Sequence, residues 1–362
     1  MLNNTKDYSK IYLVQSYPVI NNLLNKVYLD KSSSTLIIVV GNKSLELFLT
    51  KLFDKNMNVT VKRFGNTNFL LNRYKKIFYP FHLLVLRIIV TKYSCNDLYV
   101  TFKDWADFGI IQLKSISSKK RYILNPFEAQ QYKIHDIKPK SIFEFLYYLF
   151  HRFAIGKDLS LKKVLPKLNR TVPLLGLSNK YLKDNNFKIV NLKKEDLKKD
   201  ISIQISEHFR VKEKGIIFVE KDLINTGIVS NETYWEFLHE LISALNDLNL
   251  RVYLKFKPRN YNNRLQKKYE RIGMHVLPHH VPLQLFLEDP LLIMGVGFTS
   301  SSMAYNKNFK IISFSKAIKI NDDSKNKVER SIRNTILRAE SKKISFPGSV
   351  KDIITEIKNS IK

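Results

Sequence analysis

The residues best suited to chemistry lie in one stretch of the second half of the chain, residues 255–305. It contains the sequence KFKPRN, two adjacent histidines and a run of hydroxyl side chains just before a predicted helix. Cationic side chains, hydroxyls and the backbone N–H groups at a helix N-terminus all bind phosphate. We therefore predict a nucleotide-phosphate site made by Lys257, Arg259, His279, His280, Thr299, Ser300, Ser301 and Ser302.

The hydroxyl run follows a predicted strand that ends in glycines. Gly295-Val296-Gly297 is followed by Phe298-Thr299, so the G-x-G-x-x-G fingerprint of a dinucleotide site is absent, and no Walker A sequence occurs. Gly297 stays a candidate contact because it stands where the strand leads into the hydroxyls. The serines can equally be plain helix N-caps, and the sequence leaves that alternative open.

The histidines also raise the question of a metal. His275, His279 and His280 have no acidic partner at metalloprotease spacing, and the single cysteine, Cys95, excludes a multi-cysteine zinc site. A serine hydrolase is disfavoured too, because no G-x-S-x-G sequence occurs. We predict neither a metal nor a cofactor, and expect the loop histidines to hydrogen-bond a phosphate or a ribose.

A candidate general base lies in the first half of the chain. A predicted strand at 97–102 is followed by Asp104 and Asp107, and then by Gly109. Loops after parallel strands carry the active-site residues of α/β proteins, so either carboxylate can be placed to accept a proton from a hydroxyl. A turn with a helix cap accounts for the same residues.

Strands and helices alternate along both halves of the chain. Apolar runs predict strands at 11–14, 35–40, 59–62 and 97–102, and later at 215–219, 251–256, 274–277, 291–295 and 310–314. Helical spacing of apolar residues predicts helices at 19–28, 44–53, 78–92, 233–248 and 265–272, with Ser230 or Asn231 as the N-cap of the fourth. Such alternation is typical of parallel sheets.

The length of 362 residues exceeds what one hydrophobic core usually supports. We predict an α/β protein with two Rossmann-like domains that face a central cleft. The sequence is charged and irregular between 157 and 200, which suggests a domain boundary there. The predicted domains are an N-terminal Rossmann-like domain at 1–160, a linker at 161–210 and a C-terminal Rossmann-like domain at 211–362.

The charge of the chain biases its partners toward anions. Lys and Arg number 61 against 32 Asp and Glu, a formal net charge of +29. The lone cysteine indicates a reducing compartment, and the N-terminus lacks the apolar segment of a signal peptide. We predict a cytoplasmic protein that can lie at the inner face of the membrane. The aromatic segment 141–153 either lies on a membrane surface or packs in the core.

At residues 215–314 the order of elements resembles the nucleotide-binding domain of bacterial sialyltransferases and polysialyltransferases of the GT-B type. Lys257-Pro258-Arg259 stands at the family's Lys-x-His-Pro motif, Val281-Pro282-Leu283-Gln284 at its Ile-Pro-x-Glu segment and Ser300-Ser301-Ser302 at its Ser-Ser pair. The first strand, up to Gln15 and Ser16, is similar to that of the group, and residues 104–109 resemble its acidic motif. Arg259 and Gln284 depart from the family's His and Glu, and Phe108 interrupts the acidic motif.

The resemblance implies a metal-independent glycosyltransferase, in which the N-terminal domain at 1–160 binds the acceptor and the C-terminal domain at 211–362 binds the nucleotide-sugar donor. Its donor would be a CMP-activated nonulosonic acid, with sialic acid as the first choice, and its product a bacterial surface polysaccharide, such as a capsule, or a lipooligosaccharide. The resemblance also implies phosphate contacts from Lys257 and Arg259, ribose contacts from Gln284, a base at Asp107 or Asp104, and an acceptor region at Gln15 and Ser16.

Two further readings of the sequence are compatible with these residues. One is a transferase of the same architecture that uses CMP-Kdo or CDP-glycerol. The other is a non-catalytic protein that binds nucleic acid or an acidic glycan. On the first reading the partners are the CMP-sugar and a glycan or glycolipid acceptor, with peripheral contact to an anionic membrane and no specific nucleic acid, because the basic residues do not form a terminal arm.

Overall fold

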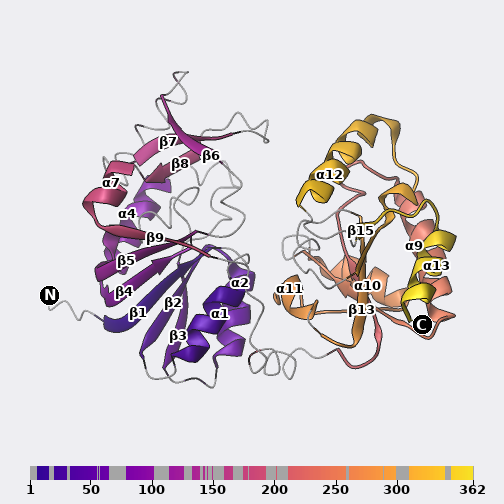
Figure 1. Ribbon diagram of the computed structural model, residues 1–362, viewed down its shortest axis with the longest axis horizontal. Helices are drawn as coiled ribbons and strands as arrows, with labels where there is room; N and C mark the ends of the chain where they lie inside the picture. Colours follow the sequence, from indigo (N-terminus) through magenta and orange to yellow (C-terminus); the bar gives the residue numbers. More distant parts are fainter. Residues whose placement is uncertain are drawn as a thin grey trace. The chain divides into compact units, whose positions relative to one another are not determined.

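The computed structural model divides the chain into two units, Met1–Ile201 and Ser202–Lys362 (Figure 1). The residues that it describes are 6–15, 20–30, 33–54, 56, 58–64, 79–101, 114–125, 133–138, 142, 145, 149, 159–165, 174–177, 179–192, 201, 211–257, 261–287, 289–298, 310–338 and 344–361. Each unit is built on one parallel sheet of six strands.

In the first unit the strand order is β3-β2-β1-β4-β5-β9, and all neighbours are parallel. The strands are β1 (Lys6–Val14), β2 (Thr35–Val40), β3 (Val59–Phe64), β4 (Tyr93–Val100), β5 (Ser117–Asn125) and β9 (Phe187–Asn191). Helices of this unit include α1 (Ile20–Leu29), α2 (Lys43–Leu52), α4 (Tyr79–Val90) and α7 (Asn179–Asp184).

Helices pack on both faces of the first sheet. Every residue of β2, TLIIVV, is buried, as expected for a strand covered on both sides. On one face, Ile11 of β1 packs in the same core cluster as Leu86 of α4. Successive strand residues point to opposite faces. Tyr12, the next residue after Ile11, therefore lies on the other face. There it stacks on Tyr99, and the ammonium of Lys26 in α1 lies over the Tyr99 ring.

The first unit continues past the predicted boundary at 160. Strand β9 lies inside the predicted linker 161–210, yet it pairs with β5 from Arg121↔Phe187 to Asn125↔Asn191. Its sequence FKIVN is half-buried or exposed throughout, so it lacks the continuous apolar run that predicts an inner strand. Phe187, Ile189 and Val190 favour a strand, and pairing with β5 at the sheet edge makes this short segment one. The division of the chain accordingly moves to Ile201 and Ser202.

A small antiparallel sheet is also present in this unit, and the sequence did not predict it. It consists of β6 (Lys133–Ile137), β7 (Leu159–Leu165) and β8 (Leu174–Leu177). The aromatic segment 141–153 falls mostly outside the described residues. Ile142, Phe145 and Leu149 are described and exposed, so these three side chains do not belong to the core of the unit.

In the second unit the strand order is β12-β11-β10-β13-β14-β15, again with parallel neighbours. The strands are β10 (Gly215–Val219), β11 (Arg251–Lys255), β12 (Met274–Val276), β13 (Leu292–Gly297), β14 (Lys310–Ser313) and β15 (Ile344–Ser345). The helices are α9 (Asn231–Asn246), α10 (Asn263–Arg271), α11 (Leu283–Phe286), α12 (Lys325–Arg338) and α13 (Val350–Ile361), with 3-10 turns η6 (Phe314–Lys316) and η7 (Asp322–Ser324).

Local sequence features explain how this unit starts its elements. The Ser230 side chain caps α9 by accepting a hydrogen bond from the Thr233 backbone N–H at 3.1 Å, which selects Ser230 over Asn231 as the N-cap. At Gly215 the first residue of β10 lies so close to the neighbouring strand that an added Cβ would be 2.2 Å from the Arg251 carbonyl oxygen.

The predicted α/β class with two Rossmann-like sheets is confirmed, and the predicted cleft between the domains stays a prediction.

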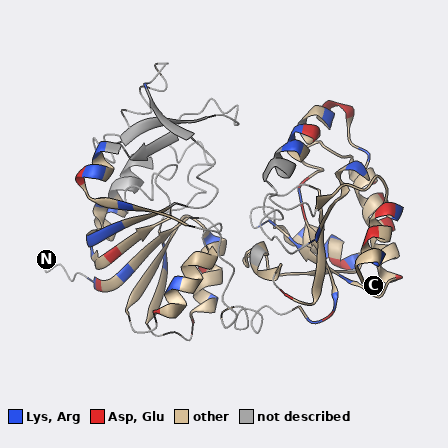
Figure 2. Ribbon diagram, in the orientation of Figure 1, with Lys and Arg blue, Asp and Glu red and all other residues tan. Residues whose placement is uncertain are grey.

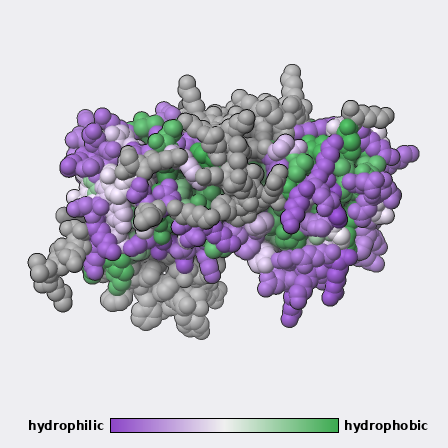
Figure 3. Space-filling view, turned by 90° about the horizontal axis from the view of Figure 1, so that it is seen from below, coloured by the Kyte–Doolittle hydropathy of each residue, from purple (hydrophilic) through white to green (hydrophobic). Residues whose placement is uncertain are grey.

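The described surface is charged. Figure 2 shows Lys and Arg on helices and strands of both units, and on the face shown in Figure 3 hydrophobic residues lie among hydrophilic ones. Among the helices that the structure describes, none has the length and apolar content needed to cross a bilayer.

Candidate active site

Strands of the second sheet end side by side where the phosphate site is predicted. Lys257 lies two residues beyond β11, His279 and His280 lie in the turn after β12, and Gly297 ends β13. These strands lie together in the order β12-β11-β10-β13, so all four residues are at the carboxyl edge of the second sheet. Gln284 lies in α11, which begins just after the same turn. This edge is where α/β sheets bind ligands.

Buried polar side chains gather at the same edge. Of the six buried polar residues described in the second unit, five lie at or just beyond the carboxyl ends of strands or in the turn after β12; they are Glu220, Lys255, His280, Ser313 and Ser315. Burying a polar group costs free energy unless it finds partners. Their concentration here marks this edge as the part of the second unit that is built for polar contacts.

Lys255 is the most unusual of these residues. It is the last residue of β11, its side chain is 3% exposed, and its Nζ donates hydrogen bonds to the carbonyl oxygens of Phe256 and His279, each at 3.0 Å. Burial lowers the pKa of its ammonium from the usual 10.5 to about 7. The sequence analysis placed this lysine inside the predicted strand 251–256, at the start of the stretch 255–305, but did not include it among the predicted site residues.

Aromatic rings define the turn that follows β12. The rings of Tyr261 and His279 are stacked with centroids 3.9 Å apart, and His280 packs edge-on against His279 at 5.5 Å. The backbone N–H of Leu277 donates to the Leu254 carbonyl at 2.9 Å, which ties the start of this turn to β11. The two predicted histidines thus belong to an ordered turn beside the end of β11.

Hydroxyls fix the ends of β13 and β14. Ser313 Oγ donates to the Phe298 carbonyl and lies 2.9 Å from Ser315 Oγ. The Lys221 ammonium lies over the Phe298 ring, 5.0 Å from its centroid. Phe298 immediately precedes the predicted hydroxyl run, so these contacts anchor the point where that run begins.

Glu220 brings a carboxylate to the same region. Its backbone N–H donates to the Lys255 carbonyl at 3.0 Å, and its side chain is 2% exposed. The buried hydroxyls of Tyr234 and Tyr269 lie 2.8 Å apart. Burial raises the pKa of both hydroxyls, and the charge of Glu220 contributes further to each rise. Sequence reasoning missed Glu220, although its position directly after an apolar strand was a usable signal.

The predicted acceptor side is described only in part. The Gln15 backbone N–H donates to Thr101 Oγ1 at 3.4 Å, and that hydroxyl donates to the Leu13 carbonyl at 3.1 Å. Gln15 therefore lies at the carboxyl edge of the first sheet, beside Thr101. The other predicted site residues lie outside the described part of the chain: Ser16, Asp104, Asp107, Arg259, Thr299, Ser300, Ser301 and Ser302.

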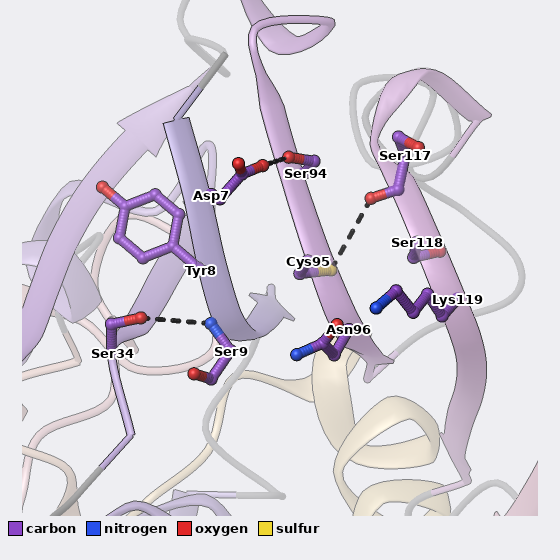
Figure 4. Close-up of a pocket in the computed structure, with 10 residues that line it drawn as sticks. All are labelled: Asp7, Tyr8, Ser9, Ser34, Ser94, Cys95, Asn96, Ser117, Ser118 and Lys119. Atoms are coloured by element: carbon purple, nitrogen blue, oxygen red, sulfur yellow. Dashed lines mark hydrogen bonds between the residues drawn. The ribbon is translucent and has the colours of Figure 1, made fainter.

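A pocket of about 510 Å³ lies at the opposite, amino end of the first sheet (Figure 4). Asp7 of β1, Ser94 and Cys95 of β4 and Lys119 of β5 are among its lining residues, and none of them was predicted as a site residue. Burial raises the pKa of the Cys95 thiol to about 12, so the thiol is protonated at neutral pH and is no nucleophile. Across the residues that the structure describes, no group of His, Cys, Asp and Glu has a metal-binding arrangement.

Comparison with protein families identifies the type of protein. Residues 137–316 match the family model described as alpha-2,8-polysialyltransferase (POLYST). The match includes the carboxyl edge of the second sheet and confirms the resemblance to the polysialyltransferase group. The chain is a sialyltransferase-like glycosyltransferase.

Solved structures similar to this glycosyltransferase have low sequence identity. The GT-B domain of a Photobacterium damselae sialyltransferase is 9% identical, with 94% of this chain and 100% of that chain covered and a TM-score of 0.45. The Methanocaldococcus jannaschii UDP-GlcNAc 2-epimerase is 11% identical, with 97% and 99% covered and a TM-score of 0.39. A Veillonella parvula glycosyl transferase of family 9 is 10% identical, with 85% and 82% covered and a TM-score of 0.37. No curated protein matches this chain.

Proposed function

We propose that this glycosyltransferase transfers a nonulosonic acid, with sialic acid as the first choice, from its CMP-activated form to a glycan acceptor. The observation that carries the proposal is the coincidence of two findings at one place. The family match spans the carboxyl edge of the second sheet, and that edge concentrates the buried polar side chains of the unit together with Lys257 and His279.

The reaction breaks the bond between the anomeric carbon of the sugar and the phosphate oxygen of CMP. The electron pair of that bond leaves with CMP, and the acceptor oxygen forms the new bond to the anomeric carbon. In the proposed mechanism Lys257, Arg259 and the hydroxyls of 299–302 stabilise the charge that develops on the departing phosphate. Asp107, or Asp104 in its place, accepts the proton of the acceptor hydroxyl. Gln284 would hydrogen-bond the ribose.

The setting of the reaction belongs to the same proposal. We place the enzyme at the inner face of the cytoplasmic membrane, acting on a surface polysaccharide or lipooligosaccharide. A net charge of +29 attracts anionic lipid and acidic glycan. The exposed apolar side chains of Ile142, Phe145 and Leu149 suit contact with a membrane surface.

The decisive test is donor-dependent release of CMP. Purified protein is incubated with CMP-sialic acid and a sialylated oligosaccharide, and CMP and the extended product are measured with and without EDTA. We expect release that EDTA does not alter, and its loss in Asp107→Ala and Lys257→Ala. Lys310→Met is the control, since Lys310 is at the amino end of β14, away from the carboxyl edge.

Parallel incubations separate the alternatives. Release of the nucleotide only from CMP-Kdo or CDP-glycerol would assign another donor to the same architecture. If no activated sugar or alcohol is consumed or raises the melting temperature, while RNA or heparin binds tightly at physiological salt, the protein is a binding protein and the proposed transfer is wrong.

A further inference from the structure

His279 is held from two sides by residues that the proposed reaction does not use. Its backbone carbonyl accepts a hydrogen bond from Lys255 Nζ at 3.0 Å. Its imidazole ring stacks on Tyr261, with ring planes inclined by 18° and centroids 3.9 Å apart. Both the main chain and the ring of this residue are therefore fixed relative to the end of β11.

The lysine contact is costly and therefore informative. An ammonium group buried to 3% exposure loses most of its hydration. A methionine or leucine would fill the same space without that cost, and would stabilise a purely structural strand end at least as well. Lys255 instead joins two carbonyls, one at the end of β11 and one in the turn after β12. The geometry suits a residue that fixes this turn.

The tyrosine contact fixes the ring. Tyr261 is itself braced, because its ring packs edge-on against the buried Phe256 at 5.9 Å and its hydroxyl donates to Gln266 Oε1 at 2.8 Å. Stacking engages the face of the imidazole, whereas hydrogen bonding uses the nitrogens at its edge. The ring pair is therefore compatible with a hydrogen bond from His279 to a ligand at the carboxyl edge.

We propose that Lys255 and Tyr261 are positioning residues that fix His279 as a contact to the phosphate of the nucleotide donor. The inference rests on the proposed function, because it requires that CMP binds at this edge. Preorganisation lowers the entropy that a side chain loses on binding, so loosening either support should weaken nucleotide affinity without changing the chemistry of the contact.

The test uses CMP itself as the probe. Binding of CMP is measured by calorimetry for the wild type, Lys255→Met, Tyr261→Leu and His279→Ala, and for the two double variants that combine each support change with His279→Ala. Lys310→Met is the matched control. Lys310 is a lysine of the same sheet, at the amino end of β14, and its Nζ donates to Ser360 Oγ of α13. All proteins carry Trp105→Phe, so the fluorescence of Trp235 in α9 verifies that the second unit of each variant is folded.

We expect Kd for CMP to rise at least tenfold in each single variant, with no change in Lys310→Met. The double variants should bind no more weakly than His279→Ala alone, because a support has no effect once the supported ring is gone. Losses that instead add up, or wild-type affinity in folded Lys255→Met and Tyr261→Leu, would overturn the inference.

If Lys255→Met does not fold, the Tyr261→Leu and His279→Ala variants and their double variant decide. A wild type that binds CMP while its variants are unchanged refutes only this inference, and a wild type that neither binds CMP nor releases it overturns the proposed function as well.

Discussion

Burial of Lys255 should make the stability of the second unit depend on pH, and Lys255→Met should abolish that dependence. Its pKa is about 7 in the folded protein and returns to about 10.5 on unfolding. Between these values the unfolded chain binds one more proton, so stability rises with pH by about 1.4 kcal/mol per pH unit. Below pH 7 the folded lysine is charged and the full cost, about 5 kcal/mol, is present.

The assay follows unfolding of the second unit alone. The chain has two tryptophans, Trp105 and Trp235, so in a Trp105→Phe background the fluorescence of Trp235 in α9 reports this unit. Urea unfolding is measured at pH 7, 8 and 9 with and without Lys255→Met. The free energy of unfolding of the lysine protein should gain about 2 kcal/mol over the methionine variant between pH 7 and pH 9.

The comparison with the variant removes the contribution of every other titrating group. Lys310→Met, which removes a half-exposed lysine, should leave the pH dependence as it is in the wild type. A constant difference between wild type and Lys255→Met from pH 7 to pH 9 would refute the reasoning. It would mean that the ammonium is hydrated, or is paired with an anionic group, in the folded protein.

Three other expectations can be checked with standard measurements. Asp107→Asn should lower kcat for CMP-sugar transfer by about 100-fold or more, since a positioned base contributes factors of this size, whereas Asp104→Asn should do so only if that residue is the base. Ser230→Ala should destabilise the second unit by about 1 kcal/mol through loss of the α9 N-cap, as measured by urea unfolding. Cys95 should react with a thiol reagent at pH 8 only after unfolding, because its thiol is buried and its pKa is raised to about 12; rapid labelling of the native protein would contradict that.

The sequence alone predicted the strands and helices that have a clear local pattern of apolar residues. The run TLIIVV became the buried strand β2, and the strand and helix series after Gly215 was found where the apolar periodicity placed it. Short-range physics is enough for such elements, because a continuous apolar run or a 3.6-residue period reflects burial directly. Strand β9 was missed because a half-exposed edge strand carries no such pattern, and only its pairing with β5 defines it.

The candidate site divides in the same way. Residue types and spacing singled out Lys257, His279 and the hydroxyl run, and the family resemblance that they carried was confirmed. The sequence did not single out Lys255 or Glu220, whose importance comes from burial at the carboxyl edge. From the sequence, a lysine at the end of a strand is expected to be an exposed surface residue. The tertiary structure buries Lys255 and places the carbonyl of His279, 24 positions away, within hydrogen-bonding distance of its ammonium. The sequence thus determined which groups are available for phosphate chemistry. Only the packing of the second unit decided which of them are buried, since burial depends on contacts between segments far apart in the chain.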